Sequence, residues 1–245
     1  QCDIAVIEMG ASAAGEITYL CSLAQPDVAV INNIQRAHIA GFGSIEAIAA
    51  AKSEIFGGLK PSGIAILNLD EIYAKQWLEL IGERQHISFS VDDSSADIFA
   101  KDIKALGNGC YGFILCVGEI AGTAPAEQAV ELPHPGIHIL SNALAAAACA
   151  LAAGASVAQI TKGLAKTKPV SGRLESKVTD DDVLVIDDTY NANPDSFKAA
   201  IDVLADMSGY RCLVMGDMGE LGADERLLHQ QVGEYAKRAN LDEIY

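Results

Sequence analysis

Short apolar runs separated by helix-length segments recur along the first part of this chain, and they constrain its fold more than any other feature. The apolar runs lie at residues 4–8, 28–32, 64–68 and 86–90. Between them, Ser44 is a good cap for a helix that stops at Gly57-Gly58, and Asp70 is expected to cap the helix that holds Trp77. Strands and helices that alternate at this spacing predict a mostly parallel sheet covered on both faces by helices.

The pattern changes after residue 97, where strand-like runs are split by Gly107-Asn108-Gly109 and by Gly118. Glycine and asparagine turns of this kind favour an antiparallel hairpin region. Two helices are expected next, and residues 168–173 then have the composition of a linker. We therefore predict one domain over residues 1–170 and a second, partial domain over residues 171–245. Both ends of the chain look cut, because each lies beside or inside an apolar strand pattern.

The most polar turn of the second domain follows an apolar run at residues 183–187. That run predicts a strand buried on both faces. The turn passes from Asp188 to Asn193, and Pro194 suits the first position of a helix because its missing N–H would be unpaired there. Open α/β sheets bind ligands at the carboxyl ends of their parallel strands, so this turn is a candidate ligand site.

The net charge of −16, with 33 acidic and 17 basic residues, excludes whole classes of partner. Nucleic acids and anionic membrane surfaces attract basic surfaces, so neither is expected to bind here. The six cysteines form no CxxC pair, which is typical of a reduced, cytosolic protein. The longest apolar run, near residues 143–153, is too short to span a bilayer. We therefore expect a cytoplasmic protein without membrane insertion.

Three residues of the first domain have chemistry that suits a metal site. Glu8 ends the first apolar run, where its carboxylate would offer the oxygen ligand that Mg²⁺ prefers, although an acid also suits the start of a helix. His38 lies in a polar loop and is either a ligand or a solvated side chain. Lys52 shares a helix face with Ile48 and Ile55. A lysine there either extends to solvent or has a lowered pKa that lets its neutral amine react with CO₂.

The nucleotide-binding signals that are visible locally leave alternatives open. Asn142 either contacts a base or is an ordinary polar residue at the start of an alanine-rich helix. Arg173, in the linker, either reaches a phosphate with both arms of its guanidinium or is a surface charge. The segment from Gly216 to Gly222 resembles a dinucleotide turn without the GxGxxG spacing, and the segment from Gly58 to Gly63 lacks the lysine of a P-loop.

Seven stretches of the chain together resemble the Mur ligases, in the order in which that family has them. The stretches are EMGASAAGEI (8–17), AHIAGFGS (37–44), AKSEIFGGL (51–59), SNALAAAA (141–148), SGRLE (171–175), DDTYNANPDSFKAA (187–200) and GDMGELG (216–222). The resemblance covers essentially the whole chain. It implies the central ATPase domain from just after its P-loop, followed by the first half of a Rossmann-like C-terminal domain.

The resemblance also implies an activity. DTYNANPDS, GDMGELG and AKSEIF are typical of the family members that join D-alanyl-D-alanine to a UDP-N-acetylmuramoyl-tripeptide in peptidoglycan precursor synthesis. Those enzymes use ATP and two Mg²⁺ ions, and they form an acyl-phosphate intermediate before the amide bond. We expect a monomer, and we expect this chain alone to be inactive because it has no Walker A lysine.

The family's site residues map onto this sequence one by one. The positions that match are Glu8 and His38 as Mg²⁺ ligands, Lys52 as the carbamylated lysine that holds the second ion, Asn142 at adenine, Arg173 at the ATP phosphates in catalysis, Asp188 at the ribose, and Tyr190, Asn191 and Asn193 nearest the substrates. The chain departs from the family at Ile137 and Ile139, where a basic residue and an asparagine usually precede Asn142. It also has Ser12-Ala13 where the family often has Asn-His.

Three other functions remain possible from the sequence. A related amide ligase, either another Mur enzyme or a folylpolyglutamate synthetase, would share the ATPase domain. A nicotinamide oxidoreductase would use the turn at Gly216–Gly222. A non-catalytic nucleotide-binding module would explain the missing P-loop.

Overall fold

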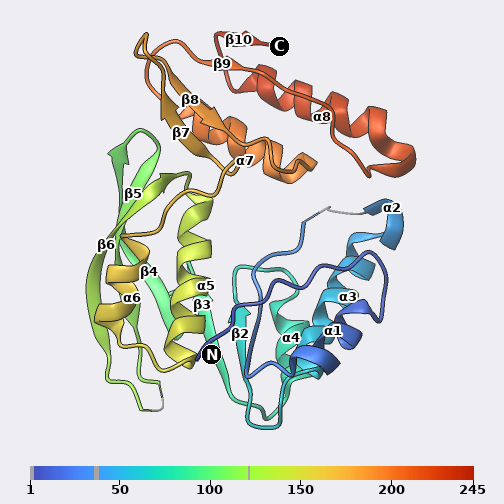
Figure 1. Cartoon of the computed structure of the whole chain (residues 1–245), viewed down its shortest axis with the longest axis vertical. Helices are drawn as coiled ribbons and strands as arrows, with labels where there is room; N and C mark the ends of the chain where they lie inside the picture. The colour runs from blue at the N-terminus through green and yellow to red at the C-terminus, as the bar shows by residue number, and fades with distance from the viewer. Residues whose placement is uncertain (1–2, 36–38, 121) are drawn as a thin grey trace.

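The computed structural model describes residues 3–35, 39–120 and 122–245, and its largest feature is a six-stranded sheet in the order β1-β2-β3-β4-β5-β6 (Figure 1). Its strands are β1 (Val28–Ile31), β2 (Ile64–Asn68), β3 (His86–Ser90), β4 (Ile98–Gly107), β5 (Cys110–Val117) and β6 (Ala126–Pro135). The first four run parallel, and the β4-β5 and β5-β6 pairs are antiparallel. The sequence prediction of a parallel sheet that ends in an antiparallel hairpin region is confirmed.

Both faces of the sheet are buried at β2 and β3, as the uninterrupted apolar character of β2 requires, whereas β4 and β6 are exposed along much of their length. Ile66 of β2 faces a core shared with α5 and α6, whereas Ala65 and Leu67 face a second core with α3 and α4. Figure 1 shows α5 and α6 on one side of the sheet and α1, α3 and α4 on the other. The helices of this part are α1 (Glu16–Ala24), α2 (Ile39–Phe42), α3 (Ile45–Gly57), α4 (Ala74–Ile81), α5 (His138–Ala152) and α6 (Val157–Leu164).

Local capping chemistry explains where several helices begin. The Ser44 side chain accepts a hydrogen bond from the backbone N–H of Ala47 and opens α3, as predicted. Ser156 opens α6 with a capping box: its hydroxyl accepts from the backbone N–H of Gln159, and the Gln159 side chain accepts from the backbone N–H of Ser156. Asp70 does not cap α4, which corrects the sequence prediction. Its carboxylate instead accepts hydrogen bonds from the Ser90 hydroxyl and the Val91 N–H, because β3 ends directly beside it.

The strand predicted at residues 4–8 is absent from the structure, although these residues are described. Ile4, Val6 and Ile7 are exposed there, Val6 almost completely. An apolar run forms a strand only where a neighbouring strand shares its backbone hydrogen bonds, and this segment belongs to none of the sheets among the described residues. Glu8 therefore lies on an exposed, irregular segment rather than at the end of a buried strand.

The C-terminal part contains two long helices and two short two-stranded sheets. Its elements are β7 (Glu175–Val178), β8 (Leu184–Asp187), α7 (Pro194–Ala205), β9 (Cys212–Leu213), η1 (Gly222–Asp224), α8 (Glu225–Arg238) and β10 (Glu243–Ile244). Ile201, Met218 and Val232 form the centre of its small core. Pro194 opens α7 as predicted, and the cap is Asn193, whose side chain accepts from the N–H groups of Asp195 and Ser196.

The strand predicted at residues 183–187 forms, but its surroundings differ from the prediction. β8 pairs antiparallel with β7, and Val183, Leu184 and Val185 are exposed. We predicted a strand buried on both faces with parallel neighbours. The difference arises because β8 lies in a two-stranded sheet with β7 alone, apart from β9 and β10, whereas burial on both faces needs a wider sheet covered by helices.

The two parts of the chain meet through a few side-chain contacts. Asn193 donates to the side-chain oxygen of Gln35 at 3.2 Å, and the Tyr111 hydroxyl donates to Asp206 at 3.3 Å. The predicted domain boundary near Ser171 stays a prediction. No helix among residues 3–35, 39–120 and 122–245 is long and apolar enough to cross a membrane.

Candidate functional site

The carboxyl ends of β1 and β2 lie next to each other, and Lys52 of α3 reaches this edge of the sheet. Its ammonium nitrogen lies 3.4 Å from the backbone oxygen of Asn33, which follows β1. Lys52 is half-buried, and burial lowers its pKa, while the charge of Glu71 acts in the opposite direction. Burial at this edge therefore favours the neutral form of the Lys52 amine more than water would.

Glu71 is a neighbour of Lys52 that the sequence reasoning missed. It follows β2, and one carboxylate oxygen accepts from the backbone N–H of Ile34 at 3.2 Å. Burial raises the pKa of Glu71, whereas that hydrogen bond and the charge of Lys52 lower it. Burial thus moves both members of the pair toward their neutral forms. The signal that could have identified Glu71 is the acidic pair Asp70-Glu71 directly after a predicted strand.

The other two predicted metal ligands cannot be assembled with Lys52 from this structure. Glu8 is exposed on the segment before α1, and His38 lies outside the described residues. Within the described residues, no group of three His, Cys, Asp or Glu side chains forms a metal site. The trio of Glu8, His38 and Lys52 therefore stays a prediction.

The helix that carries Lys52 is tied to α1 by its next acidic residue, Glu54. The Glu54 carboxylate accepts from the N–H groups of Gly15 and Thr18 and from the Thr18 hydroxyl, at 2.7 to 3.0 Å. Burial alone would raise the pKa of Glu54, but these three hydrogen bonds together lower it. Glu54 thus satisfies free N–H groups at the start of α1 and fixes α1 against α3.

Three asparagines form a hydrogen-bonded chain at the same edge of the sheet. The Asn32 amide, after β1, donates to the side-chain oxygen of Asn142 in α5 at 2.5 Å. The Asn68 amide, at the end of β2, donates to the backbone oxygen of Asn32 at 2.8 Å. Asn142, which was predicted at adenine, therefore lies at this edge on one face of the sheet, and α3 covers the other face. Asn32 and Asn68 were not singled out from the sequence, although both end parallel strands.

Arg173 and Asp188, which were predicted at the nucleotide, lie together in the C-terminal part. The backbone N–H of Leu174 donates to the Asp188 carboxylate at 3.1 Å, and the Arg173 guanidinium lies 4.3 Å from the centre of the Tyr190 ring. Burial raises the pKa of Asp188, and the Leu174 N–H, His138 and Arg173 oppose that shift. Gly172 has a φ of +72°, which favours glycine, and a Cβ at this position would lie only 3.0 Å from the backbone nitrogen of Tyr190.

Two other predicted substrate residues are already engaged within the turn. The Asn191 side chain accepts from the backbone N–H of Ala192 at 2.9 Å. The Asn193 amide caps α7 and contacts Gln35, as described above. Both residues hold the turn in shape, so any contact of theirs with a substrate stays a prediction.

His138, at the start of α5, is a second residue that the sequence reasoning missed. Its ring lies over Gly136, which has a φ of +107°, and a side chain at Gly136 would also meet Val203 of α7. Burial lowers the pKa of His138, while the charges of Asp188 and Asp202 raise it. The ring therefore lies where the two parts of the chain meet.

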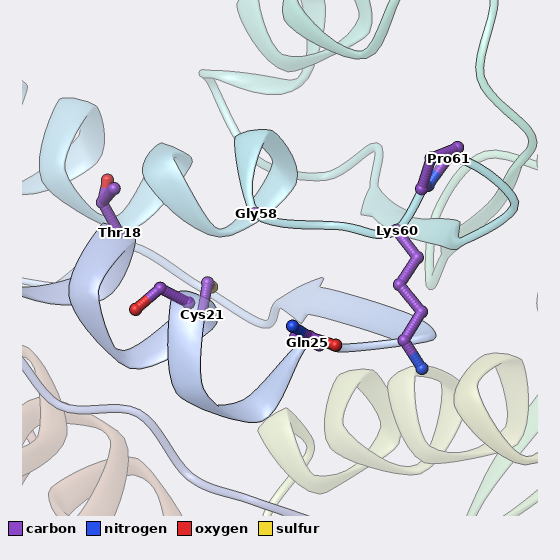
Figure 2. Close-up of a pocket in the computed structure, with 7 residues that line it drawn as sticks. Thr18, Cys21, Gln25, Gly58, Lys60 and Pro61 are labelled. Atoms are coloured by element: carbon purple, nitrogen blue, oxygen red, sulfur yellow. The ribbon is translucent and has the colours of Figure 1, made fainter.

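A shallow pocket of about 570 Å³ lies elsewhere, between α1 and the loop after α3 (Figure 2). Its lining residues are Thr18, Cys21, Ser22, Gln25, Gly58, Lys60 and Pro61. The charge of Lys60 is paired with Asp27 at 2.7 Å. None of the predicted site residues lines this pocket, so we do not assign the function to it.

Comparisons with known proteins match this arrangement. The family model of the Mur ligase middle domain matches residues 1–150, and that of the Mur ligase glutamate ligase domain matches residues 172–245. The UDP-N-acetylmuramoyl-tripeptide–D-alanyl-D-alanine ligase of Escherichia coli is 45% identical over 242 residues, 99% of this chain and 52% of that protein. The Bacillus subtilis protein of the same name is 36% identical over 250 residues, 99% of this chain and 50% of that protein.

Solved structures match over nearly the whole chain. A crystal structure of MurF from Acinetobacter baumannii has a TM-score of 0.87 and 38% identity over 96% of this chain and 49% of that chain. MurF of Thermotoga maritima in complex with ADP has a TM-score of 0.79 and 28% identity over 97% of this chain and 52% of that chain. The chain thus spans about half the length of these relatives.

Proposed function

This chain belongs to the Mur ligase family, and we propose that it is part of an ATP-dependent ligase that adds D-alanyl-D-alanine to a UDP-N-acetylmuramoyl-tripeptide. The observation that carries the proposal is the 45% identity to the Escherichia coli enzyme of that name over 99% of this chain. The placement of Lys52 and Asn142 at one sheet edge supports it, because ligands of open α/β sheets bind there.

The reaction that we propose has two steps. The terminal carboxylate of the tripeptide attacks the γ-phosphorus of ATP, which gives an acyl phosphate and ADP. The amine of D-alanyl-D-alanine then attacks the acyl carbon and loses a proton, and phosphate leaves. Arg173 offers a fixed positive charge for the phosphates, and Asp188 lies beside it for the ribose.

Lys52 is suited to carbamylation, which would create a Mg²⁺ ligand, since burial lowers the pKa of its amine. The neutral amine adds to CO₂ and releases a proton, which turns a cation into a carboxylate-like oxygen donor. We propose Glu8, His38 and the Lys52 carbamate as the residues that hold two Mg²⁺ ions. The ions would screen the repulsion between the substrate carboxylate and the triphosphate.

Asn142 is proposed at the adenine, and Tyr190, Asn191 and Asn193 are proposed nearest the peptide substrates. We also infer a monomer that works in the cytoplasm. The described cysteines support the location, because Cys21, Cys110, Cys116, Cys149 and Cys212 are all free thiols.

The test is a screen of amine substrates with the full-length enzyme that contains this chain. ADP release is measured with the UDP-N-acetylmuramoyl-tripeptide and, in turn, D-alanyl-D-alanine, D-glutamate, meso-diaminopimelate and L-glutamate. We expect release that depends on D-alanyl-D-alanine. Turnover with another amine would identify a different Mur-type or folylpolyglutamate-type ligase, and saturable NADH binding would instead support an oxidoreductase.

A further inference from the structure

Asn32 and Asn142 form a pair of amides that bridges two elements of the ATPase domain. Asn32 directly follows β1, and Asn142 lies near the start of α5, which packs on β1 through β4. The Asn32 Nδ2 donates to the Asn142 Oδ1 at 2.5 Å. Asn32 extends from a packed strand and Asn142 lies in a packed helix, so the sheet and the helix hold the two side chains beside each other.

The backbone of Asn32 is itself held in place. Asn68, which is 3% exposed, donates its amide to the Asn32 backbone oxygen at 2.8 Å. The Asn68 side-chain oxygen in turn accepts from the backbone N–H of Asp70 at 3.0 Å. Asn68 thereby holds the Asn32 backbone in place, and the Asn32 side chain extends from that backbone to Asn142 of α5.

This contact decides which polar atom Asn142 presents outward. Its oxygen is occupied by Asn32, so its Nδ2 hydrogens remain as the free donors of an exposed side chain. Ile139, one turn earlier, packs partly against the core and offers no hydrogen bond that could orient the amide. Among the described residues, Asn32 is thus the side chain that sets the orientation of Asn142.

The Asn32 side chain would be a poor choice for stability alone. Its Oδ1 is buried and has no hydrogen-bond partner within the described part of the chain. A buried acceptor without a partner is destabilising, whereas an apolar side chain of similar size is not. An asparagine at this position is therefore explained by the donor that it gives to Asn142.

We propose that Asn32 is a positioning residue for nucleotide recognition, which fixes the Asn142 amide so that its N–H donor faces the base. The proposal rests on the proposed function, because it assumes that Asn142 contacts a purine. A donor in this orientation suits a ring nitrogen acceptor, such as N7 of adenine. Reversal of the amide would present an oxygen to that acceptor and weaken binding.

The test is a double-mutant cycle for binding of a non-hydrolysable ATP analogue to the full-length enzyme, measured by calorimetry. We expect Asn32→Leu and Asn142→Leu each to raise the Kd about fivefold, the effect of one typical hydrogen bond. The double variant should bind no more than about twofold more weakly than Asn142→Leu, because Asn32 acts through Asn142. In steady-state assays, the defect of Asn32→Leu should appear in the KM for ATP rather than in kcat.

Thermal melting separates positioning from a structural role. Asn32→Leu should melt at or above the wild-type temperature, because it removes the unpaired buried acceptor.

If Asn32→Leu does not fold, the variant Asn32→Asp provides the test instead. Its carboxylate accepts from the Asn142 Nδ2 and reverses the amide, so the Kd should rise about tenfold or more. The exposed turn variant Asn108→Asp is the matched control and should bind as wild type does.

A wild-type Kd in the Asn32 variants, or effects that multiply in the double variant, would overturn the proposal. Failure of the proposed function looks different. An enzyme that binds the analogue but ligates another amine would refute the ligase assignment and leave the amide cycle interpretable. A wild-type enzyme that binds no nucleotide would overturn both.

Discussion

At the scale of single residues, the site contains two ionisable side chains whose charged forms are disfavoured by burial, and asparagine amides that are hydrogen-bonded to one another. Lys52 and Glu71 are both moved toward neutrality by burial, although they attract each other. The attraction between two buried charges often does not offset the loss of their hydration. Burial thus favours the neutral form of each partner, and for Lys52 that form is the nucleophilic amine.

The first prediction concerns Lys52. We expect Lys52→Ala in the full-length enzyme to abolish ligation, by about 100-fold or more, because the proposed metal ligand is lost. Added short carboxylates such as acetate should restore part of the rate by replacing the carbamate oxygens. The measurement is ADP release that depends on D-alanyl-D-alanine, with and without acetate. Lys60→Ala, which removes an exposed lysine paired with Asp27, is the control and should retain wild-type turnover. Ordinary turnover by Lys52→Ala would exclude the carbamate role.

At the scale of elements, the sequence predicted what local chemistry determines and failed where a neighbour was needed. β2 and β3 begin and end as predicted, and α3 opens at Ser44, because apolar runs and caps act within a few residues. The run at residues 4–8 and the surroundings of β8 were wrong, since both depend on which strand lies alongside. Asn32, Glu71 and His138 were missed because their partners are distant in sequence.

The second prediction concerns the start of α3, the helix that carries Lys52. Ser44→Ala should lower the free energy of unfolding by about 1 kcal/mol, because the Ala47 N–H loses its acceptor. The measurement is a urea transition of the 245-residue chain, followed by the fluorescence of its single tryptophan, Trp77, which is fully buried. Ser94→Ala, at an exposed turn, should stay within about 0.5 kcal/mol of wild type. Equal midpoints for the two variants would show that the cap contributes nothing.

At the scale of the whole molecule, the candidate site is divided between two parts of the chain. Lys52 and Asn142 belong to the sheet domain, whereas Arg173 and Asp188 belong to the linker and the C-terminal part. The parts meet at Gln35–Asn193, at Tyr111–Asp206 and around His138. A nucleotide that contacts both groups would favour their approach, and this closure would exclude water from a labile acyl phosphate.

The third prediction is a pH dependence that arises at this junction. Burial holds the pKa of His138 below its ordinary value, against the charges of Asp188 and Asp202. The neutral ring is therefore the stable form in the folded chain. This stability is present above the unfolded pKa of about 6.5 and is lost as the pH falls through the lower folded value. His138→Gln should flatten the decline in the urea midpoint between about pH 7 and pH 5. The exposed-histidine variant His86→Gln should keep the wild-type slope, and a slope unchanged in His138→Gln would refute the assignment.

The last prediction concerns what this chain can do alone. It carries no Walker A motif, the glycine-rich loop whose lysine reaches the terminal phosphates of ATP. Arg173 and the proposed metal ligands would hold a nucleotide from the other side, and catalysis of phosphoryl transfer depends on positioning from all sides. We therefore expect the 245-residue chain to show no ADP release dependent on D-alanyl-D-alanine, whereas a protein of its relatives' full length does. Both are assayed at equal concentration, and a native melting transition establishes that the chain is folded. Release from the 245-residue chain above the buffer rate would show that these two parts suffice for the reaction.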